Sequence, residues 1–239
     1  MAAVNLTKRN FRVILLAPAL AGAGMLPLLG GCGSQPPATA TVATHVAAGQ
    51  ICGEDIDRTG TELIKNSGFA DGMADWQNVD VPGSQGTDLA KLVNDPSCGT
   101  SVLTLMRQGS GNVSGLIGLK QALNVNKGNF SILQVQLVAR IDQQAMTSDG
   151  VLGGESPVFI TLDYTTTGGQ DKSWTHGLVI GKVNYPARDQ AIPAAYWFTY
   201  KSGNLLTMLP DLASVKNVTI GGNGNDFASR VALVSLLGK

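Results

Sequence analysis

Residues 133–142 have the sequence LQVQLVARID, and residues 158–165 have the sequence VFITLDYT. Apolar and polar residues alternate in both stretches, as in a β-strand that turns one face to a core. The expected core faces consist of Leu133, Val135, Leu137, Ala139 and Ile141 in the first stretch, and of Val158, Ile160, Leu162 and Tyr164 in the second. The opposite faces carry Gln134, Gln136 and Arg140 in the first stretch, and Asp163 in the second.

Short runs of the same kind recur along the rest of the chain. They occupy residues 101–108, 116–125, 174–183, 196–201, 215–220 and 230–237. Turns rich in Gly, Asn, Asp and Pro separate these runs, which is typical of antiparallel all-β domains. Eight or more such strands predict a two-sheet antiparallel sandwich of the jelly-roll kind. One short helix is expected at residues 88–93, while residues 61–65 fit either a helix or a strand.

Residues 1–31 have the composition of a cleaved secretory signal. A basic start precedes an apolar stretch at residues 13–29, which proline and glycine interrupt. This stretch is too short and too broken to cross a membrane as a helix. Residues 32–50 are small and nearly uncharged, so they predict a flexible tether with a reach of about 20–25 Å; the alternative is a first strand at residues 39–46. Residues 51–239 then form a single folded domain.

The signal ends in Leu29-Gly30-Gly31-Cys32, which resembles a bacterial lipobox. The resemblance implies cleavage before Cys32 and lipidation of its thiol. Several acyl chains, palmitate among them, would hold the protein at the membrane, because one chain alone binds marginally. The alternative is an ordinary signal that contains a cysteine. Since Gly33 follows rather than an aspartate, we expect the outer membrane in a two-membrane bacterium, and otherwise the outer face of the cytoplasmic membrane.

The charge of the mature chain argues against a nucleic-acid partner. All 17 acidic residues follow the tether, whereas three of the 17 basic residues belong to the signal. The mature chain therefore carries 14 basic and 17 acidic residues, a net charge of −3. No basic stripe occurs in the sequence, so a nucleic-acid partner is not expected.

Cys52 and Cys98 are the only cysteines of the expected domain. In an exported protein two cysteines favour a disulfide. Such a bond would tie the start of the domain to a loop beyond the first strands. Two unpaired buried thiols are the alternative.

Several segments, in order along the chain, resemble carbohydrate-binding modules with the jelly-roll, galactose-binding-like fold. These segments are LIKNSGFADGMADW (63–76), SGNVSGLIGLKQALNV (110–125), ARIDQQAMTSDGVLGGESPVFITLDYTTTGG (139–169), SWTHG (173–177), YWFTYKSGNLL (196–206) and VTIGGNGNDFASRVALVSL (218–236). The likeness spans nearly the whole expected domain. It implies a non-catalytic sandwich that binds glycan or another polar ligand.

Modules of this kind often hold a structural calcium through an acidic residue after the Phe of the opening motif and an Asp in the last strand. The matching positions here are Ala70 and Ala232. Calcium takes six to eight oxygen ligands, usually with carboxylates among them. Asp71, Asp75 or Asp226 could substitute, but turn and capping roles suit them better, so we expect no metal.

Candidate ligand-binding residues come from polar strand faces and from aromatic side chains. Trp174 with its neighbour His176 is the best candidate platform for a sugar ring, although packing in the core is the simpler role. Gln134, Gln136, Arg140 and Asp163 could line a concave sheet, and a solvated polar face is the alternative. Trp76 is expected in the core, whereas Trp197 lies on one of two alternating faces.

The sequence argues against an enzyme. His176 is the only histidine outside the tether, which excludes a multi-histidine zinc site. No nucleophile elbow or phosphate-binding glycine loop occurs, and Glu155 and Asp163 are the only acids near the middle strands that could form a glycosidase pair. We expect no cofactor. The sequence supports two hypotheses for function: a lipid-anchored glycan-binding module, or a structural or protein-interaction lipoprotein that binds no sugar.

Overall fold

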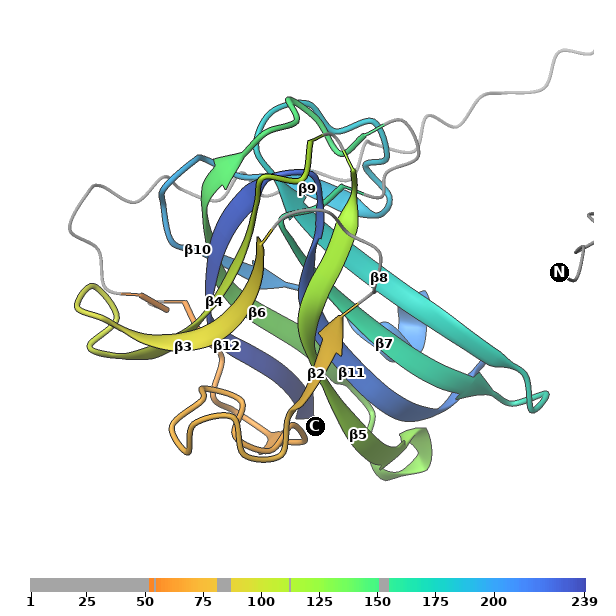
Figure 1. Ribbon diagram of the computed structural model, residues 1–239. Helices are drawn as coiled ribbons and strands as arrows, with labels where there is room; N and C mark the ends of the chain where they lie inside the picture. Colours follow the sequence, from red (N-terminus) through yellow and green to blue (C-terminus); the bar gives the residue numbers. More distant parts are fainter. Residues whose placement is uncertain (1–51, 54, 81–86, 112, 151–154) are drawn as a thin grey trace, which may run out of the picture. The chain divides into compact units, whose positions relative to one another are not determined.

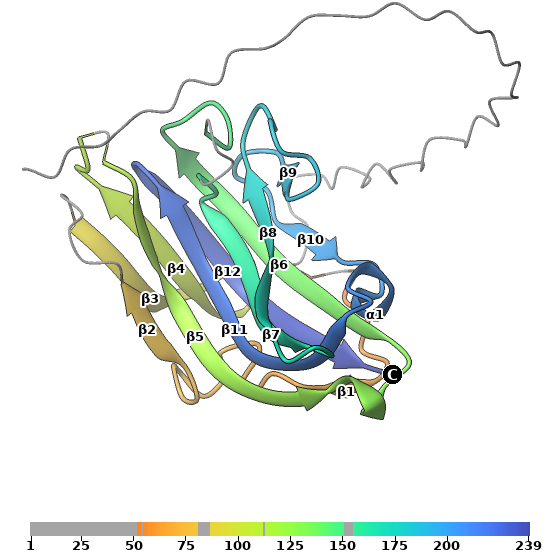
Figure 2. The ribbon, with the colours of Figure 1, turned by 90° about the vertical axis from the view of Figure 1, so that its right-hand side faces the viewer.

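The computed structural model describes residues 52–239 apart from residues 54, 81–86, 112 and 151–154. This part of the chain is a β-sandwich of two six-stranded sheets, called sheet A and sheet B below (Figures 1 and 2). The predicted two-sheet jelly-roll class is confirmed. The predicted signal, tether and lipidated Cys32 lie outside the described residues. Among the described residues, no helix has the length and apolar character needed to cross a membrane.

Sheet A has the strand order β10-β6-β12-β4-β3, and β1 pairs with the last residues of β12. Its strands are β1 (Thr61–Glu62), β3 (Thr87–Asp95), β4 (Thr100–Gln108), β6 (Leu133–Gln144), β10 (Phe198–Lys201) and β12 (Phe227–Gly238). All of its pairs are antiparallel. The register between β6 and β12 sets Arg140 opposite Arg230. Directly opposite residues project from the same face, so these two side chains are neighbours.

Sheet B has the strand order β2-β5-β11-β7-β8-β9. Its strands are β2 (Gln77–Asp80), β5 (Gly115–Asn126), β7 (Val158–Thr166), β8 (Asp171–Val179), β9 (Asp189–Ala191) and β11 (Leu212–Gly224). Every pair is antiparallel except β8–β9, which is parallel. This one pair departs from the predicted antiparallel arrangement, because a loop between the two strands returns the chain before β9 begins.

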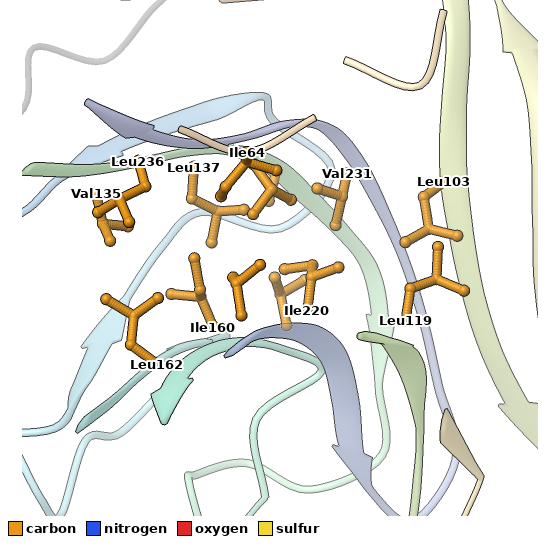
Figure 3. Packing of buried hydrophobic residues seen from close by; sticks show 14 of the residues in the cluster. Ile64, Leu103, Leu119, Val135, Leu137, Ile160, Leu162, Ile220, Val231 and Leu236 are labelled. Carbon is orange, nitrogen blue, oxygen red and sulfur yellow. The ribbon is translucent and has the colours of Figure 1, made fainter. Parts of the chain in front are cut away.

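The core lies between the inner faces of the two sheets. Figure 3 shows Val135, Leu137, Val231 and Leu236 of sheet A facing Ile160, Leu162 and Ile220 of sheet B. The alternating apolar residues predicted for β6 and β7 are all buried in this cluster. Burying one Leu or Ile side chain contributes about 1.5–3 kcal/mol to folding, so the period-two pattern carries much of the fold's stability.

The predicted helix at residues 88–93 is wrong. This segment belongs to β3, which pairs with β4 over its whole length, from Thr87 opposite Gln108 to Asp95 opposite Thr100. The Asp88 carboxylate also accepts two hydrogen bonds from the buried Arg107 guanidinium, at 2.7 and 2.8 Å. Pairing with a distant strand thus overrides the local helical spacing of the apolar residues. Residues 61–65, left open between helix and strand, begin with β1.

The structure contains two short helices that were not predicted from the sequence, η1 (Lys127–Asn129) and α1 (Leu205–Met208). Asn126 and Asn204 cap them, each accepting a hydrogen bond from a backbone N–H two residues ahead. Asn204 Oδ1 also accepts from the N–H of Leu133 at 3.1 Å, which fixes α1 against the start of β6. Figure 2 shows α1, β1 and the C-terminus at the same end of the sandwich.

The predicted disulfide between Cys52 and Cys98 is present. Cys98 lies in the turn between β3 and β4, so the bond fixes the start of the domain to the outer face of sheet A. A small apolar cluster of Val102, Val138 and Ala232 lies there, and the two cysteines and Trp197 pack against it. One end of this outer face is therefore covered.

The opening motif forms a compact turn that contributes to the core. Phe69 and Trp76 are buried, with ring centroids 5.7 Å apart. The Asn66 side-chain amide donates to the carbonyl oxygens of Gly72 and Ala74, and Trp76 Nε1 donates to the Asn66 carbonyl. The expectation that Trp76 is a core residue is confirmed.

Candidate ligand-binding site

The six side chains predicted to bind ligand lie in three separate places. Gln134, Gln136 and Arg140 project from the outer face of β6, in sheet A. Asp163 projects from the outer face of β7, in sheet B. Trp174 and His176 point between the sheets, because they pair with the core residues Leu162 and Ile160. The six do not converge on one groove, and binding by any of them stays a prediction.

Gln134 and Gln136 are committed to structural contacts. The Gln136 amide is fully buried, accepts a hydrogen bond from the N–H of Asp57 at 2.7 Å and donates to the Asp57 carbonyl at 2.8 Å. Gln134 Nε2 donates to the Ser202 carbonyl at 2.8 Å. These two amides therefore hold neighbouring chain segments on β6.

Asp163 lies beside a hollow of about 200 Å³ on the outer face of sheet B. Its carboxylate accepts hydrogen bonds from Ser173 Oγ at 2.8 Å, Lys120 Nζ at 3.0 Å and Asn217 Nδ2 at 3.3 Å. Burial raises the pKa of Asp163, but the bonds from Lys120 and Ser173 outweigh burial and lower it. The other two lysines near the hollow are paired as well, Lys172 with Asp211 and Lys216 with Asp171. This face is polar, but each of its lysines is paired with an aspartate.

Trp174 and His176 belong to an aromatic stack at the margin of the core. The His176 ring lies 3.8 Å from the Tyr200 ring and 6.3 Å from the Trp174 ring, with nearly parallel planes. Trp174 is half-buried and packs against the core. Burial lowers the pKa of His176 to about 4, although a hydrogen bond with Gln190 opposes the shift. The stack links the edges of the two sheets, so Trp174 is less accessible than the sequence suggested.

Arg140 belongs to a chain of charged groups that crosses the outer face of sheet A, called the charged row below. Arg140 Nε donates to Asp142 Oδ1 at 2.6 Å, and Arg230 Nε lies 2.9 Å from Asp142 Oδ2. Arg230 Nη1 donates to Asp95 Oδ2 at 2.7 Å. Asp142 thus holds two guanidinium groups that would otherwise repel each other across the β6–β12 pair.

Trp197 borders the charged row and is joined to it. The residue immediately precedes β10, whose first residue, Phe198, pairs with Ala139, the neighbour of Arg140. Trp197 Nε1 donates to Ser97 Oγ at 2.8 Å, and Ser97 Oγ donates to Asp95 Oδ1 at 2.5 Å. The indole is half-exposed and its polar atom is satisfied, so it forms a fixed apolar surface beside two guanidinium groups.

The electrostatics of the charged row favour the ionised forms. Burial raises the pKa of Asp95, but hydrogen bonds from Ser97 and Arg230 outweigh burial and lower it. The hydrogen bond to Asp95 raises the pKa of Arg230 further. Arg140 and Arg230 keep 26% and 35% of their side chains exposed. Two oriented guanidinium groups are therefore accessible from solvent, and such groups bind hydroxyl, carboxylate or sulfate oxygens.

The opening turn does not suit the calcium site that its sequence resemblance implies. Ala70 is exposed, and Ala232 lies in the apolar cluster on the outer face of sheet A. Asp71 and Asp75 are exposed to solvent. Asp226 lies elsewhere, accepting hydrogen bonds from the backbone N–H groups of Gly109 and Ser110. No buried side-chain oxygen of the described residues 61–76 lacks a partner, so these residues do not fit a calcium ion.

The structure also reveals a buried carboxyl pair that sequence reasoning missed, Asp149 and Asp189. The Asp149 carboxylate accepts hydrogen bonds from the backbone N–H groups of Asn184 and Tyr185 at 2.9–3.0 Å. Asp189 is buried, accepts from Ser156 Oγ at 3.2 Å and lies within hydrogen-bonding reach of Asp149. Burial raises the pKa of Asp189 to about 6; Arg188 opposes the shift and Asp149 adds to it. Asp189 therefore holds its proton to a higher pH than an exposed aspartate does.

Sequence reasoning found Arg140 but missed Arg230, its neighbour across the strand pair, and Asp95, the partner of Arg230. Both lie far from Arg140 along the chain. Asp142 follows Arg140 by two residues, so strand alternation places it on the same face. The sequence does not reveal the register between β6 and β12. A bulge in β12 decides which of its residues lies opposite Arg140. The sequence left Trp197 open between two faces, and its packing against the cluster of Val102, Val138 and Ala232 assigns it to the outer one.

No model of a protein family matches this chain, and no curated protein sequence matches it. Solved structures with a similar fold include carbohydrate-binding modules. A family 61 module in complex with β-1,4-galactotriose is 14% identical, with a TM-score of 0.44, over 75% of this chain and 99% of that one. The family 11 module of a cellulosomal cellulase of Clostridium thermocellum is 14% identical, with a TM-score of 0.45, over 75% and 96%.

A third similar structure is a family 22 xylan-binding domain from Paenibacillus barcinonensis. It is 9% identical, with a TM-score of 0.42, over 77% of this chain and 97% of that one. These structural neighbours are carbohydrate-binding modules with a jelly-roll fold. All three TM-scores are below 0.5.

Proposed function

We propose that this protein is a lipid-anchored lipoprotein of the bacterial envelope whose sandwich binds glycan at the charged row without catalysis. The observation that supports binding is the combination of two oriented, part-exposed guanidinium groups with a fixed indole. Sugar recognition needs donors and acceptors for hydroxyl groups and an apolar surface for the C–H face of the ring. Arg140, Arg230 and Asp142 supply the polar atoms, and Trp197 supplies the apolar surface.

The anchor part of the proposal rests on the sequence alone. Cys32 at the end of the signal would carry the acyl chains, and residues 33–50 would tether the domain. The glycan would then be bound at the outer membrane of a two-membrane host, or at the outer face of the cytoplasmic membrane of a host with one.

The positions of the acids predicted as a glycosidase pair, and of the buried carboxyl pair, support the non-catalytic part of the proposal. Glycoside cleavage needs two carboxyl groups facing each other across a cleft at roughly 5–9 Å. Glu155 lies beside Gly150 and Gly224, whereas Asp163 is held by Lys120, Ser173 and Asn217 on the outer face of sheet B. The close pair of Asp149 and Asp189 is buried. None of these arrangements offers two accessible acids to one substrate.

The test is affinity electrophoresis of the full chain in non-ionic detergent against a broad panel of polysaccharides. We expect retardation by at least one of them, lost in Arg140→Ala and in Trp197→Ala. The matched control is Lys216→Ala, which removes a cation from the outer face of sheet B. Binding that all three variants keep would move the site away from the charged row. No binding across the panel would favour the alternative, a structural or protein-interaction lipoprotein.

A further inference from the structure

The donors of the charged row are only partly used by the protein. Arg140 engages Asp142 through Nε alone, and Arg230 uses Nε and Nη1. A guanidinium group carries five N–H donors, so both Nη groups of Arg140 and Nη2 of Arg230 have no acceptor among the described residues. These terminal donors belong to side chains that are about one-quarter to one-third exposed.

The row also has an excess of positive charge. Lys91 extends it on β3, because Lys91 pairs with Thr104 and Thr104 pairs with Arg230. Three cations thus face two carboxylates, and both carboxylates already accept hydrogen bonds from the arginines.

We propose that the charged row selects an acidic polysaccharide, with a carboxylate or sulfate of one sugar bound by Arg140 and Arg230 and a ring seated on Trp197. This inference rests on the proposed function and specifies the ligand class of the same site. Guanidinium groups bind planar carboxylate and tetrahedral sulfate oxygens through paired hydrogen bonds, which are stronger than bonds to neutral hydroxyl groups. Carboxylates that hold the guanidinium groups in place reduce the ordering cost of binding.

The test compares polysaccharides that share a backbone and differ only in charge. The full chain, solubilised in non-ionic detergent, is titrated with polygalacturonate and its methyl ester, and with dextran sulfate and dextran. We expect the charged member of at least one pair to bind more tightly, by roughly tenfold to a hundredfold. The pair that shows the difference identifies carboxylate or sulfate as the recognised group.

Arg140→Gln should reduce that preference to within a few-fold, because it removes the terminal donors while Asp142 stays paired with Arg230. Arg140→Lys, which keeps the charge but loses the paired donors, should fall between the two. Lys216→Ala is the control for general charge attraction and should leave the preference unchanged. Thermal melting of each variant checks folding, and Arg140→Lys provides the test if Arg140→Gln does not fold.

Three outcomes would overturn the inference. Equal or tighter binding of the uncharged members would refute the ligand class while leaving glycan binding intact. An equal loss of preference in Lys216→Ala and Arg140→Gln would mean that overall charge, and not the row, attracts the anion. Absence of binding to all four polymers and to the wider panel would refute the inference together with the proposed function.

Discussion

The stability of the domain should depend on pH through two groups that act in opposite directions, the buried Asp189 and the half-buried His176. Asp189 has a pKa raised to about 6 from 3.8, and His176 has a pKa lowered to about 4 from 6.5. The folded state therefore holds the Asp189 proton more tightly than the unfolded chain, and the His176 proton less tightly. Asp189→Asn removes the first effect, and His176→Phe removes the second while keeping a ring in the stack.

The size of each effect follows from the pKa shifts. One unit corresponds to 1.36 kcal/mol, so each shift, of about two units, is worth about 3 kcal/mol. The contribution of Asp189 to the free energy of unfolding is highest below pH 4 and falls as the pH rises to 6. The contribution of His176 is highest above pH 6.5 and falls as the pH drops to 4. In the wild-type protein the two changes should nearly cancel over this range.

Urea denaturation at half-unit steps from pH 4.5 to 7 measures these slopes. The wild-type free energy of unfolding should vary by less than about 1 kcal/mol, because the two contributions offset each other. In Asp189→Asn it should rise with pH by about 2–3 kcal/mol, and in His176→Phe it should fall by a similar amount. Parallel curves for the three proteins, or slopes with the opposite signs, would refute this account of the two groups.

Three further predictions concern the anchor, the disulfide and the metal. Cys32→Ser should release the protein from membranes or leave its precursor uncleaved; unchanged fractionation with normal processing would contradict lipidation. The Cys52→Ser/Cys98→Ser variant loses a bond that joins positions 46 residues apart, and chain entropy predicts a loss of up to about 4 kcal/mol in urea denaturation; an unchanged midpoint would contradict this. Melting temperatures in EDTA and in millimolar calcium should coincide, and a rise of several degrees with calcium would show a site that the opening turn does not reveal.

The alternation of apolar and polar residues was enough to predict the sandwich, because it is a local property of the sequence. The inward and outward residues of β6 and β7 follow directly from their sequence, and the structure buries the predicted set. For β3 the same rule failed. Apolar residues at 89, 90, 92 and 93 have helical spacing, and only pairing with β4 makes the segment a strand.

The binding site was less predictable because it depends on which strands are neighbours. Arg140 was identifiable from its strand face, but Arg230 becomes its partner only through the β6–β12 register. Trp174 illustrates the same limit. Its sequence allows either face of β8, and its pairing with Leu162 turns it toward the core. Two-fold periodicity therefore groups residues into faces but does not say which face meets solvent.

The disulfide sets the path of any mechanical load on the domain. A pull applied through the preceding chain reaches Cys52 and passes through the covalent bond to Cys98, in the turn just before β4. The segment between them, which contains β1, β2 and β3, bears no tension. About 150 Å of contour length is thereby withheld from extension, at roughly 3.4 Å per residue. Resistance to pulling then depends on how β4 is held between β3 and β12, and reducing the bond would let the domain peel from its first residues.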